Sequence, residues 1–418
     1  MTLYRLLMTL AQPVLWLTTA IGSALGRTMR GALWHRLALP MSSDPVLPGR
    51  VWLHGASLGE LTSARWLIER LLTERADLSL IVTCNSETAR RMLIGWALPR
   101  TAVRLAPFDS RGAVRRFLDH WRPVALITLE NELWPERVAQ AHARAMPVLW
   151  IGARISERSA RRWSRLAPRL IADTLARLAF VSAQDQASEA RLIRLGLPPA
   201  AIGPRLMLKA QAARADDTAA PPFAPPAPRA ATLLAASTHE GEEGPILDAF
   251  ATQDRFGLLI LAPRHPDRAA AIRAGIEGRG LPVAQRSRGE VPGSETRVYL
   301  ADTLGEMPLW YRMAGATVIG GTFADRGGHT PFEPAAHGSA ILHGPSIGNF
   351  AEPFAALQAG GGALAVAGPA DLAAALAGLT PERQQDLAQA AGRILAPGAD
   401  DRDFLAAFEA ALPPAPLP

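Results

Sequence analysis

From residue 50 onward the chain alternates between short apolar runs and longer stretches in which apolar residues recur every three or four positions. The short runs favour buried strands, and the recurring spacing favours helices with one apolar face. In the first half the predicted helices include residues 60–72 and 87–98, and the predicted strands are residues 51–54, 80–83, 124–129, 148–151 and 178–181. Such alternation predicts a parallel sheet with helices on both faces.

The same alternation restarts after a segment rich in alanine and proline. Residues 210–230 contain five prolines and are predicted to form a linker. Beyond it, the predicted strands are residues 232–236, 258–261, 298–300, 317–319 and 340–342. We therefore expect an α/β protein with two Rossmann-like, doubly wound domains facing a cleft, at residues 48–209 and 231–396. A C-terminal helix and tail follow at residues 397–418.

The N-terminus carries a third pattern. Residues 6–25 are largely apolar and lie between Arg5 and Arg27. One stripe at helical spacing consists of Leu3, Leu7, Leu10, Val14, Leu17, Ile21 and Leu25. The segment fits a spanning helix, a helix lying in the membrane interface, a cleaved signal peptide or a core helix of the fold. We predict a membrane-anchor helix over residues 1–30.

Composition narrows the class of protein. The chain has 418 residues, of which 49% are hydrophobic and 20% charged, so it is long enough for two packed domains. The net charge of +6 favours anionic partners such as phospholipid headgroups or phosphorylated substrates. No nucleic-acid-binding signature occurs in the sequence, so nucleic acid is not an expected partner. A single cysteine, Cys84, excludes a disulfide framework and a thiolate metal site.

Two clusters of candidate catalytic residues follow strands of the first half. Residues 54–60 read His-Gly-Ala-Ser-Leu-Gly-Glu, and Ser57 with Glu60 matches a capping box that serves only the helix. A carboxylate at a strand–helix turn also faces the cleft, where Glu60 would be a general base. Glu130 and Glu132 follow another strand, and we expect one of them in the cleft unless they form a solvated loop.

Three further clusters follow strands of the second half. They comprise Pro263, Arg264 and His265, then Gly305, Glu306 and Met307, and finally Thr330, Pro331, Phe332 and Glu333. An arginine fork binds phosphate, and helix N-termini direct N–H groups at anions. Beside Gly327 and Gly328 we expect Thr330 as N-cap, Pro331 in the first helical position, and Glu333 completing a capping box.

Together these motifs resemble the 3-deoxy-D-manno-octulosonic acid (Kdo) transferase family of lipopolysaccharide synthesis. The resemblance runs from about residue 50 to residue 360, and its most specific motifs are residues 237–243, 263–266, 302–307 and 327–334. It implies a GT-B glycosyltransferase fold, a CMP-Kdo donor, and neither a metal nor another cofactor. It also implies a lipid A precursor as acceptor, at the cytoplasmic face of the anionic inner membrane.

The resemblance also assigns roles by position. Glu60 resembles the family's general base, and Glu130 resembles a residue that assists the transition state. The clusters at 263–265, 305–307 and 330–333 resemble parts of the CMP site.

Three positions depart from the family pattern. Thr330 stands where the family usually has Asn, and Asn131 where it usually has Thr. Residues 203–209 read Gly-Pro-Arg-Leu-Met-Leu-Lys, whereas the family carries a Gly-Asn-x-Lys segment whose lysine is thought to assist catalysis. Either Arg205 or Lys209 takes that place, or the step is altered.

Two other functions stay open at this point. One is another GT-B glycosyltransferase or a sugar epimerase that uses a different nucleotide. The other is a non-catalytic paralogue that binds lipid A precursors. The presence of Glu60 and Glu130 favours an enzyme.

Overall fold

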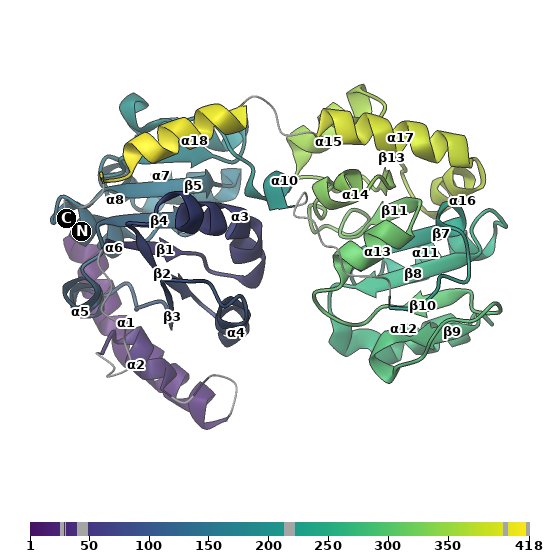
Figure 1. The fold of residues 1–418 in the computed structure, drawn as a ribbon, viewed down its shortest axis with the longest axis horizontal. Helices are drawn as coiled ribbons and strands as arrows, with labels where there is room; N and C mark the ends of the chain where they lie inside the picture. Colours follow the sequence, from purple (N-terminus) through teal and green to yellow (C-terminus); the bar gives the residue numbers. More distant parts are fainter. Residues whose placement is uncertain (26–28, 30, 40–48, 213–221, 396–399, 415–418) are drawn as a thin grey trace. The chain divides into compact units, whose positions relative to one another are not determined.

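The computed structural model describes residues 1–25, 29, 31–39, 49–212, 222–395 and 400–414. The chain divides into two compact units, Met1–Ala212 with Pro397–Pro418, and Ala213–Ala396. Each contains a sheet covered by helices (Figure 1). Residues 213–221 of the predicted linker lie outside the described residues, as do Arg27 and Arg30.

In the described part of the first unit, six parallel strands form a sheet in the order β3-β2-β1-β4-β5-β6. The strands are β1 Arg50–His54, β2 Ser79–Cys84, β3 Thr101–Leu105, β4 Ala125–Leu129, β5 Val148–Ala153 and β6 Phe180–Ala183. The helices are α1 Thr2–Ala24, α2 Ala32–Arg36, α3 Leu58–Glu74, α4 Glu87–Gly95, α5 Arg111–Trp121, α6 Pro135–His142, α7 Glu157–Leu166, α8 Pro168–Leu175, α9 Gln186–Arg194, α10 Leu208–Ala212 and α18 Asp400–Ala411. This is the Rossmann order, and its topological switch point lies between the carboxyl ends of β1 and β4.

The side chains of β1 alternate between two hydrophobic cores. Val51 and Leu53 pack in the core that contains α3, α4 and α18. Trp52 points to the opposite face and packs on Phe117 of α5, with ring centroids 4.3 Å apart. Because both faces of the strand are covered, β1 is buried along its whole length, as expected for a parallel sheet.

The C-terminal helix α18 belongs to the first unit although it follows the second unit in the sequence. Phe404 and Phe408 stack with centroids 5.5 Å apart and lie 6.1 and 6.5 Å from the ring of Phe180 in β6. Figure 1 shows α18 in yellow across the first unit. The predicted C-terminal helix therefore closes a core of the first unit.

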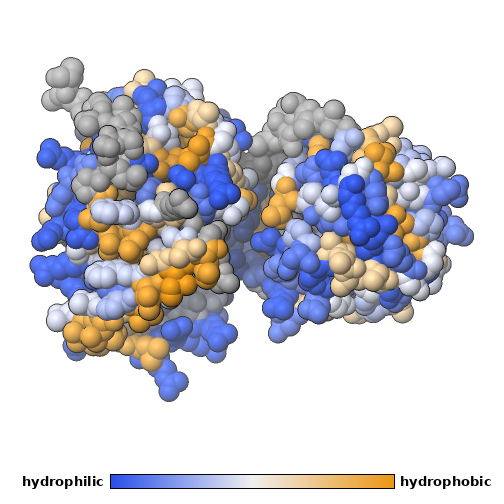
Figure 2. All heavy atoms as spheres, turned by 90° about the horizontal axis from the view of Figure 1, so that it is seen from below, coloured by the Kyte–Doolittle hydropathy of each residue, from blue (hydrophilic) through white to orange (hydrophobic). Residues whose placement is uncertain are grey.

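Helix α1 exposes its apolar stripe. The residues of the predicted stripe are 47–69% exposed; they are Leu3, Leu7, Leu10, Val14, Leu17, Ile21 and Leu25. The helix is long and apolar enough to cross a membrane, and none of its residues is buried. In Figure 2 hydrophobic side chains gather on the face of the first unit that carries this helix. The exposed stripe rules out a core helix.

The first unit also begins earlier than the sequence predicts. His35 of α2 is buried, and its Nδ1 accepts the Leu105 N–H at 3.1 Å. Arg36 donates to the carbonyl oxygens of Asn85 at 2.7 Å and Ala106 at 3.0 Å. Helix α2 thus supports the edge of the sheet at β2 and β3.

In the described part of the second unit, seven parallel strands form a sheet in the order β13-β12-β11-β7-β8-β10-β9. The strands are β7 Thr232–Thr238, β8 Leu258–Pro263, β9 Val283–Gln285, β10 Val298–Leu300, β11 Ala316–Ile319, β12 Ala340–His343 and β13 Ala363–Ala365. The helices are α11 Glu243–Ala251, α12 Ala269–Glu277, α13 Met307–Met313, α14 Phe332–Ala336, α15 Ala351–Ala359, α16 Pro369–Ala377 and α17 Pro381–Ile394. The switch point of this sheet lies between β7 and β11.

Candidate functional site

Glu60 lies at the switch point of the first unit, in the first turn of α3. Ser57 caps the helix by accepting the Glu60 N–H at 3.3 Å, so the capping interaction is present. The Glu60 carboxylate accepts the Ala56 N–H at 2.6 Å, and the residue is only 8% exposed. The turn from β1 into α3 therefore holds a nearly buried carboxylate at the carboxyl end of β1.

Glu130 lies across the same switch point, directly after β4. Its φ of +43° is a left-handed conformation that costs about 1–3 kcal/mol for residues other than glycine. Its N–H donates to the Ile151 carbonyl at 3.0 Å, and its carbonyl accepts the indole N–H of Trp150 at 2.8 Å. These contacts with β5 hold the strained turn, which points to a positional requirement on Glu130.

Glu132, in the loop after β4, is linked to β1 through His54, the last residue of that strand. Its Oε2 is 2.9 Å from His54 Nε2 and also accepts from Trp134 Nε1 at 2.7 Å and Asn85 Nδ2 at 3.2 Å. On the other side of the ring, His54 Nδ1 lies 3.0 Å from Thr83 Oγ1. The loop after β4 is therefore tied to the ends of β1 and β2.

The carboxylates of this cluster differ in their pKa values. Burial raises the pKa of Glu60 to about 7, and the nearby charges of Glu130 and Glu132 add to this effect. Burial also lowers the pKa of His54 to about 4, with the charge of Arg137 acting in the same direction, so this histidine is neutral. For Glu132, burial is outweighed by the hydrogen bonds from His54 and Trp134, which lower its pKa to about 2. Glu60, whose pKa is raised to about 7, thus lies near Glu132, which stays ionised at neutral pH.

Lys209 adds a positively charged side chain to this cluster. It lies in α10, and its Nζ is 3.7 Å from Glu130 Oε2. Leu208 is buried beside Gly152 of β5, where the added Cβ of any other residue would lie 3.0 Å from the leucine side chain. Arg205 is exposed and has no ion pair among the described residues. Of the two candidates for the family's lysine, the structure brings Lys209 to the cluster.

A second cluster lies at the switch point of the second unit. Glu242 is buried and accepts the N–H groups of Gly321 at 2.7 Å, Phe323 at 2.9 Å and His239 at 2.8 Å. Gly320 directly follows β11 and lies close to the end of β7. A Cβ added at this position would be 2.3 Å from the carbonyl oxygen of Ser237. Glu242 therefore fastens the glycine loop after β11 to the loop after β7.

Three histidines meet at this edge. His239 and His329 stack with centroids 5.1 Å apart, and their Nε2 atoms are 2.9 Å apart. His265 meets His239 edge-on at 5.7 Å. Burial lowers the pKa of His239, an effect that Glu242 opposes and His265 reinforces. The predicted motifs after β7, β8 and β11 are therefore brought together.

Arg264 and His265 follow β8 with exposed side chains, while Pro263 is the buried last residue of that strand. The Arg264 N–H donates to the Thr238 carbonyl at 2.9 Å, which fixes its backbone beside the end of β7. No salt-bridge partner of its guanidinium is present within the described ranges. This arginine is therefore placed to meet an anion from solvent.

The cluster after β10 is engaged within the protein. Glu306 pairs with Arg286, whose Nη2 is 2.6 Å from Glu306 Oε1, and it also accepts from Thr303 Oγ1. Gly305 adopts a φ of +87°, and Met307 begins α13. The Glu306 side chain thus stabilises this turn, which leaves the backbone N–H groups of the turn as the candidate ligand contacts.

The cluster after Gly328 differs from the predicted capping box. The helix α14 begins at Phe332, one residue later than expected, and Pro331 takes the N-cap position. Thr330 Oγ1 accepts the Phe332 N–H at 3.3 Å, whereas Glu333 Oε2 accepts from the Tyr311 hydroxyl at 3.4 Å. The prediction that Glu333 closes the box was wrong because this side chain is directed to α13.

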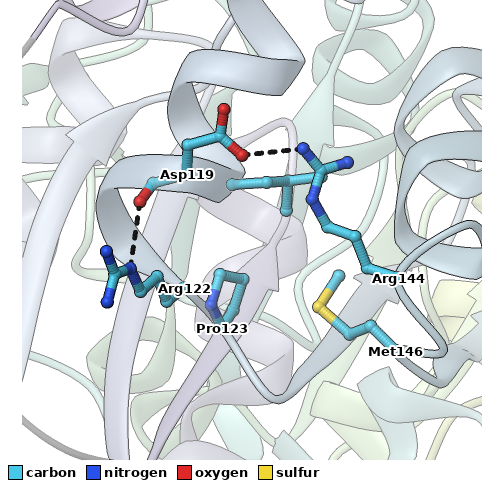
Figure 3. A pocket seen from close by; sticks show the side chains of 6 residues that line it. Asp119, Arg122, Pro123, Arg144 and Met146 are labelled. Atoms are coloured by element: carbon cyan, nitrogen blue, oxygen red, sulfur yellow. Dashed lines mark hydrogen bonds and ion pairs between the residues drawn. The ribbon is translucent and has the colours of Figure 1, made fainter.

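A cavity of about 380 Å³ lies elsewhere in the first unit (Figure 3). Its lining residues are Leu118, Asp119, Arg122, Pro123, Arg144 and Met146. Arg144 donates to Asp119 at 2.8 Å, and Pro123 and Met146 lie just before β4 and β5. The cavity is therefore at the amino ends of these strands, opposite the edge that carries Glu60 and Glu130.

Two Rossmann-like units, each with polar side chains gathered at its switch point, define the GT-B class of enzymes that act on nucleotide sugars. A similar fold occurs in the UDP-GlcNAc 2-epimerase of Neisseria meningitidis, solved bound to UDP-GlcNAc, with a TM-score of 0.58 and 12% identity. That comparison covers 86% of this chain and all of the epimerase chain, and it shows the fold alone.

Within this class, sequence comparison identifies the family. Residues 31–212 match the family 3-Deoxy-D-manno-octulosonic-acid transferase (kdotransferase). The 3-deoxy-D-manno-octulosonic acid transferase of Bordetella pertussis is 34% identical over 330 residues, 76% of each chain. The enzyme of the same name from Haemophilus influenzae is 28% identical over 378 residues, 88% of this chain and 87% of the relative. The chain belongs to the Kdo transferase family of glycosyltransferases.

Proposed function

We propose that this protein transfers Kdo from CMP-Kdo to a lipid A precursor of the lipid IVA type, by an inverting displacement that needs no metal. Membership of the Kdo transferase family supports Kdo as the transferred sugar. The observation that carries the chemistry is Glu60, a nearly buried carboxyl at a topological switch point, whose pKa is raised to about 7. A base with this pKa is half ionised at neutral pH and suits proton transfer from a hydroxyl.

In the proposed step, Glu60 removes the proton from the acceptor hydroxyl. The hydroxyl oxygen forms a bond to the anomeric carbon of Kdo, while the bond from that carbon to the CMP phosphate oxygen breaks. The electron pair of the broken bond leaves on CMP, and the anomeric configuration inverts. Glu130 lies near the base, and Lys209 at 3.7 Å from Glu130 holds a positive charge there.

The second unit supplies the donor contacts. Arg264 and His265 are exposed at the end of β8, and the glycine loop after β11 is fastened by Glu242. A guanidinium and backbone N–H groups can neutralise the phosphate of CMP as it leaves, so we propose that no metal ion takes part. The clusters 305–307 and 330–333 would complete the nucleotide contacts, as the family resemblance implies.

The exposed stripe of α1 supports a location at the membrane. An apolar helix face that no described residue covers is stabilised by lipid. CMP-Kdo is a soluble nucleotide sugar and the lipid acceptor lies in a membrane, so we propose the cytoplasmic face of the inner membrane as the working site.

The test is a transfer assay with the full-length protein in detergent micelles. Incubation with CMP-Kdo and a tetra-acylated lipid A precursor should give lipid whose mass has risen by one or more Kdo units, in the presence or absence of EDTA. A parallel incubation with UDP-GlcNAc should leave that sugar unchanged. Epimerised UDP-GlcNAc together with unmodified lipid would contradict the proposal and favour an epimerase. If the protein binds the lipid A precursor but changes neither the lipid nor UDP-GlcNAc, the result would point to a non-catalytic paralogue.

A further inference from the structure

The first turn of α1 is fixed to the first unit by two polar side chains. The Tyr4 hydroxyl donates to Asp109 Oδ2 at 2.6 Å. Arg5 binds Glu136 with two nitrogens, Nε at 2.8 Å and Nη2 at 3.2 Å. Neither contact is needed to place an apolar stripe in a membrane, so the start of the helix has a second role.

The partners of these side chains lie at the start of α6. Asp109 is buried, and its two carboxylate oxygens each accept one N–H, from Glu136 and Arg137, at 2.9 Å. Glu136 is fully buried, and Gln140 also donates to it at 2.8 Å. Without Arg5, the Glu136 carboxylate would lose its ion-pair partner while it stays away from water, a change that is strongly destabilising for a buried charge.

Helix α6 in turn begins where the loop of Glu130 and Glu132 ends. Trp134 is the N-cap residue of α6, and its indole N–H donates to Glu132 at 2.7 Å. The Arg137 guanidinium lies 5.3 Å from the Trp134 ring. A displacement at the first turn of α6 would therefore move the loop that carries Glu130.

Arg137 provides a second route between the two sites. It is buried, with its Nε 3.9 Å from Asp109 Oδ1 and its guanidinium 5.6 Å from the ring of Trp52 in β1. Its charge lowers the pKa of both His54 and Glu132. The position of this cation therefore affects the electrostatics beside Glu60.

We propose that Tyr4 and Arg5 are positioning residues for the loop of residues 130–134, so that the anchoring helix also sets the geometry of the active site. The inference rests on the proposed catalytic role of that loop. An enzyme whose α1 is lifted from Asp109 and Glu136 turns over slowly even when its substrate is supplied in solution.

The experiment compares variants of the full-length enzyme in detergent micelles, where the membrane contributes nothing to encounter with the acceptor. Arg5→Ala removes the ion pair, Arg5→Lys keeps its charge, and Tyr4→Phe removes one hydroxyl. Arg161→Ala is the matched control, because it removes an exposed ion pair to Glu157 within α7. Turnover, KM for CMP-Kdo, and the melting temperature are measured for each variant.

We expect Arg5→Ala to lower kcat about 10- to 100-fold, the scale of a displacement of about 1 Å in a catalytic group. KM for CMP-Kdo should stay within twofold, and Arg5→Lys should recover most of the loss. Tyr4→Phe should lower kcat to a smaller extent, and the control should match the wild type.

Unchanged kcat in Arg5→Ala would overturn the inference. If Arg5→Ala does not fold, Tyr4→Phe and Arg5→Lys decide the matter, and wild-type turnover in Tyr4→Phe would overturn it. A wild-type enzyme that transfers no Kdo would instead contradict the proposed function, so the two failures are distinguishable.

Discussion

At the scale of single residues, Lys209 and Arg205 show how the local path of the chain selects a functional group. The two cations lie four positions apart in the segment that departs from the family pattern. Burial of Leu208 beside Gly152 turns α10 so that Lys209 reaches Glu130, whereas Arg205 remains exposed. The lysine is therefore the better candidate for the family's catalytic lysine.

This choice gives a matched pair of variants. Lys209→Ala should lower kcat roughly 100-fold, the usual loss when one electrostatic contact to the transition state is removed. Arg205→Ala should stay close to wild-type turnover. Steady-state kinetics with CMP-Kdo and the lipid A precursor measure both, and the reverse order of effects would assign the role to Arg205.

The sequence predicted some features of the site and missed others for physical reasons. Glu60 was predicted both as a cap and as a base because a strand–helix turn determines both positions locally. The bond between His54 and Glu132 could not be predicted, since it depends on β1 and β4 being neighbours in the sheet. The buried Arg137 was missed because nothing in its local pattern separates it from a surface arginine of an amphipathic helix.

At the scale of elements, the predicted strands of both units are present, with ends shifted by up to two residues. The strands that were missed are β3, β9 and β13. Two of them are only three residues long, and β3 is a half-buried edge strand with a mixed pattern. Edge strands bury little apolar surface, so hydrophobic periodicity gives them a weak signal.

Helix α1 gives a prediction at this scale. Replacement of Leu10, Val14 and Leu17 by Asn should move the protein from vesicles to the soluble fraction, because burial of each apolar side chain in lipid contributes about 1.5–3 kcal/mol. The control replaces three exposed apolar residues of other first-unit helices, Ile94, Leu166 and Ile193. Co-sedimentation with anionic vesicles measures both.

Equal binding of the stripe variant and the control would show that α1 is not the membrane anchor. Turnover of the stripe variant in detergent should remain near the wild-type value, because Tyr4 and Arg5 are intact. This separates attachment to the membrane from support of the catalytic loop.

At the scale of the whole molecule, the two-domain α/β architecture could be predicted from the sequence. The unit to which each terminal helix belongs could not. Both α1 and α18 belong to the first unit, and α18 buries Phe404 and Phe408 there. Such pairings depend on packing between distant segments, which a local pattern does not report. The predicted start of the first domain at residue 48 changes accordingly, because Tyr4, Arg5 and His35 also make contacts within the first unit.

The division of chemistry between the units is the central claim. We propose that the first unit holds the base and that the second holds the contacts to CMP. A variant of the base should therefore separate catalysis from donor binding.

The most direct measurement is transfer by Glu60→Gln, followed by mass spectrometry, together with calorimetric titration of CMP. We predict a loss of about 10²–10⁴-fold in rate with CMP affinity unchanged. Since the base acts in its ionised form and its pKa is raised to about 7, wild-type kcat/KM should rise as pH increases through about 7. Turnover of Glu60→Gln within a few-fold of the wild type would contradict the account and leave Glu60 as a helix cap.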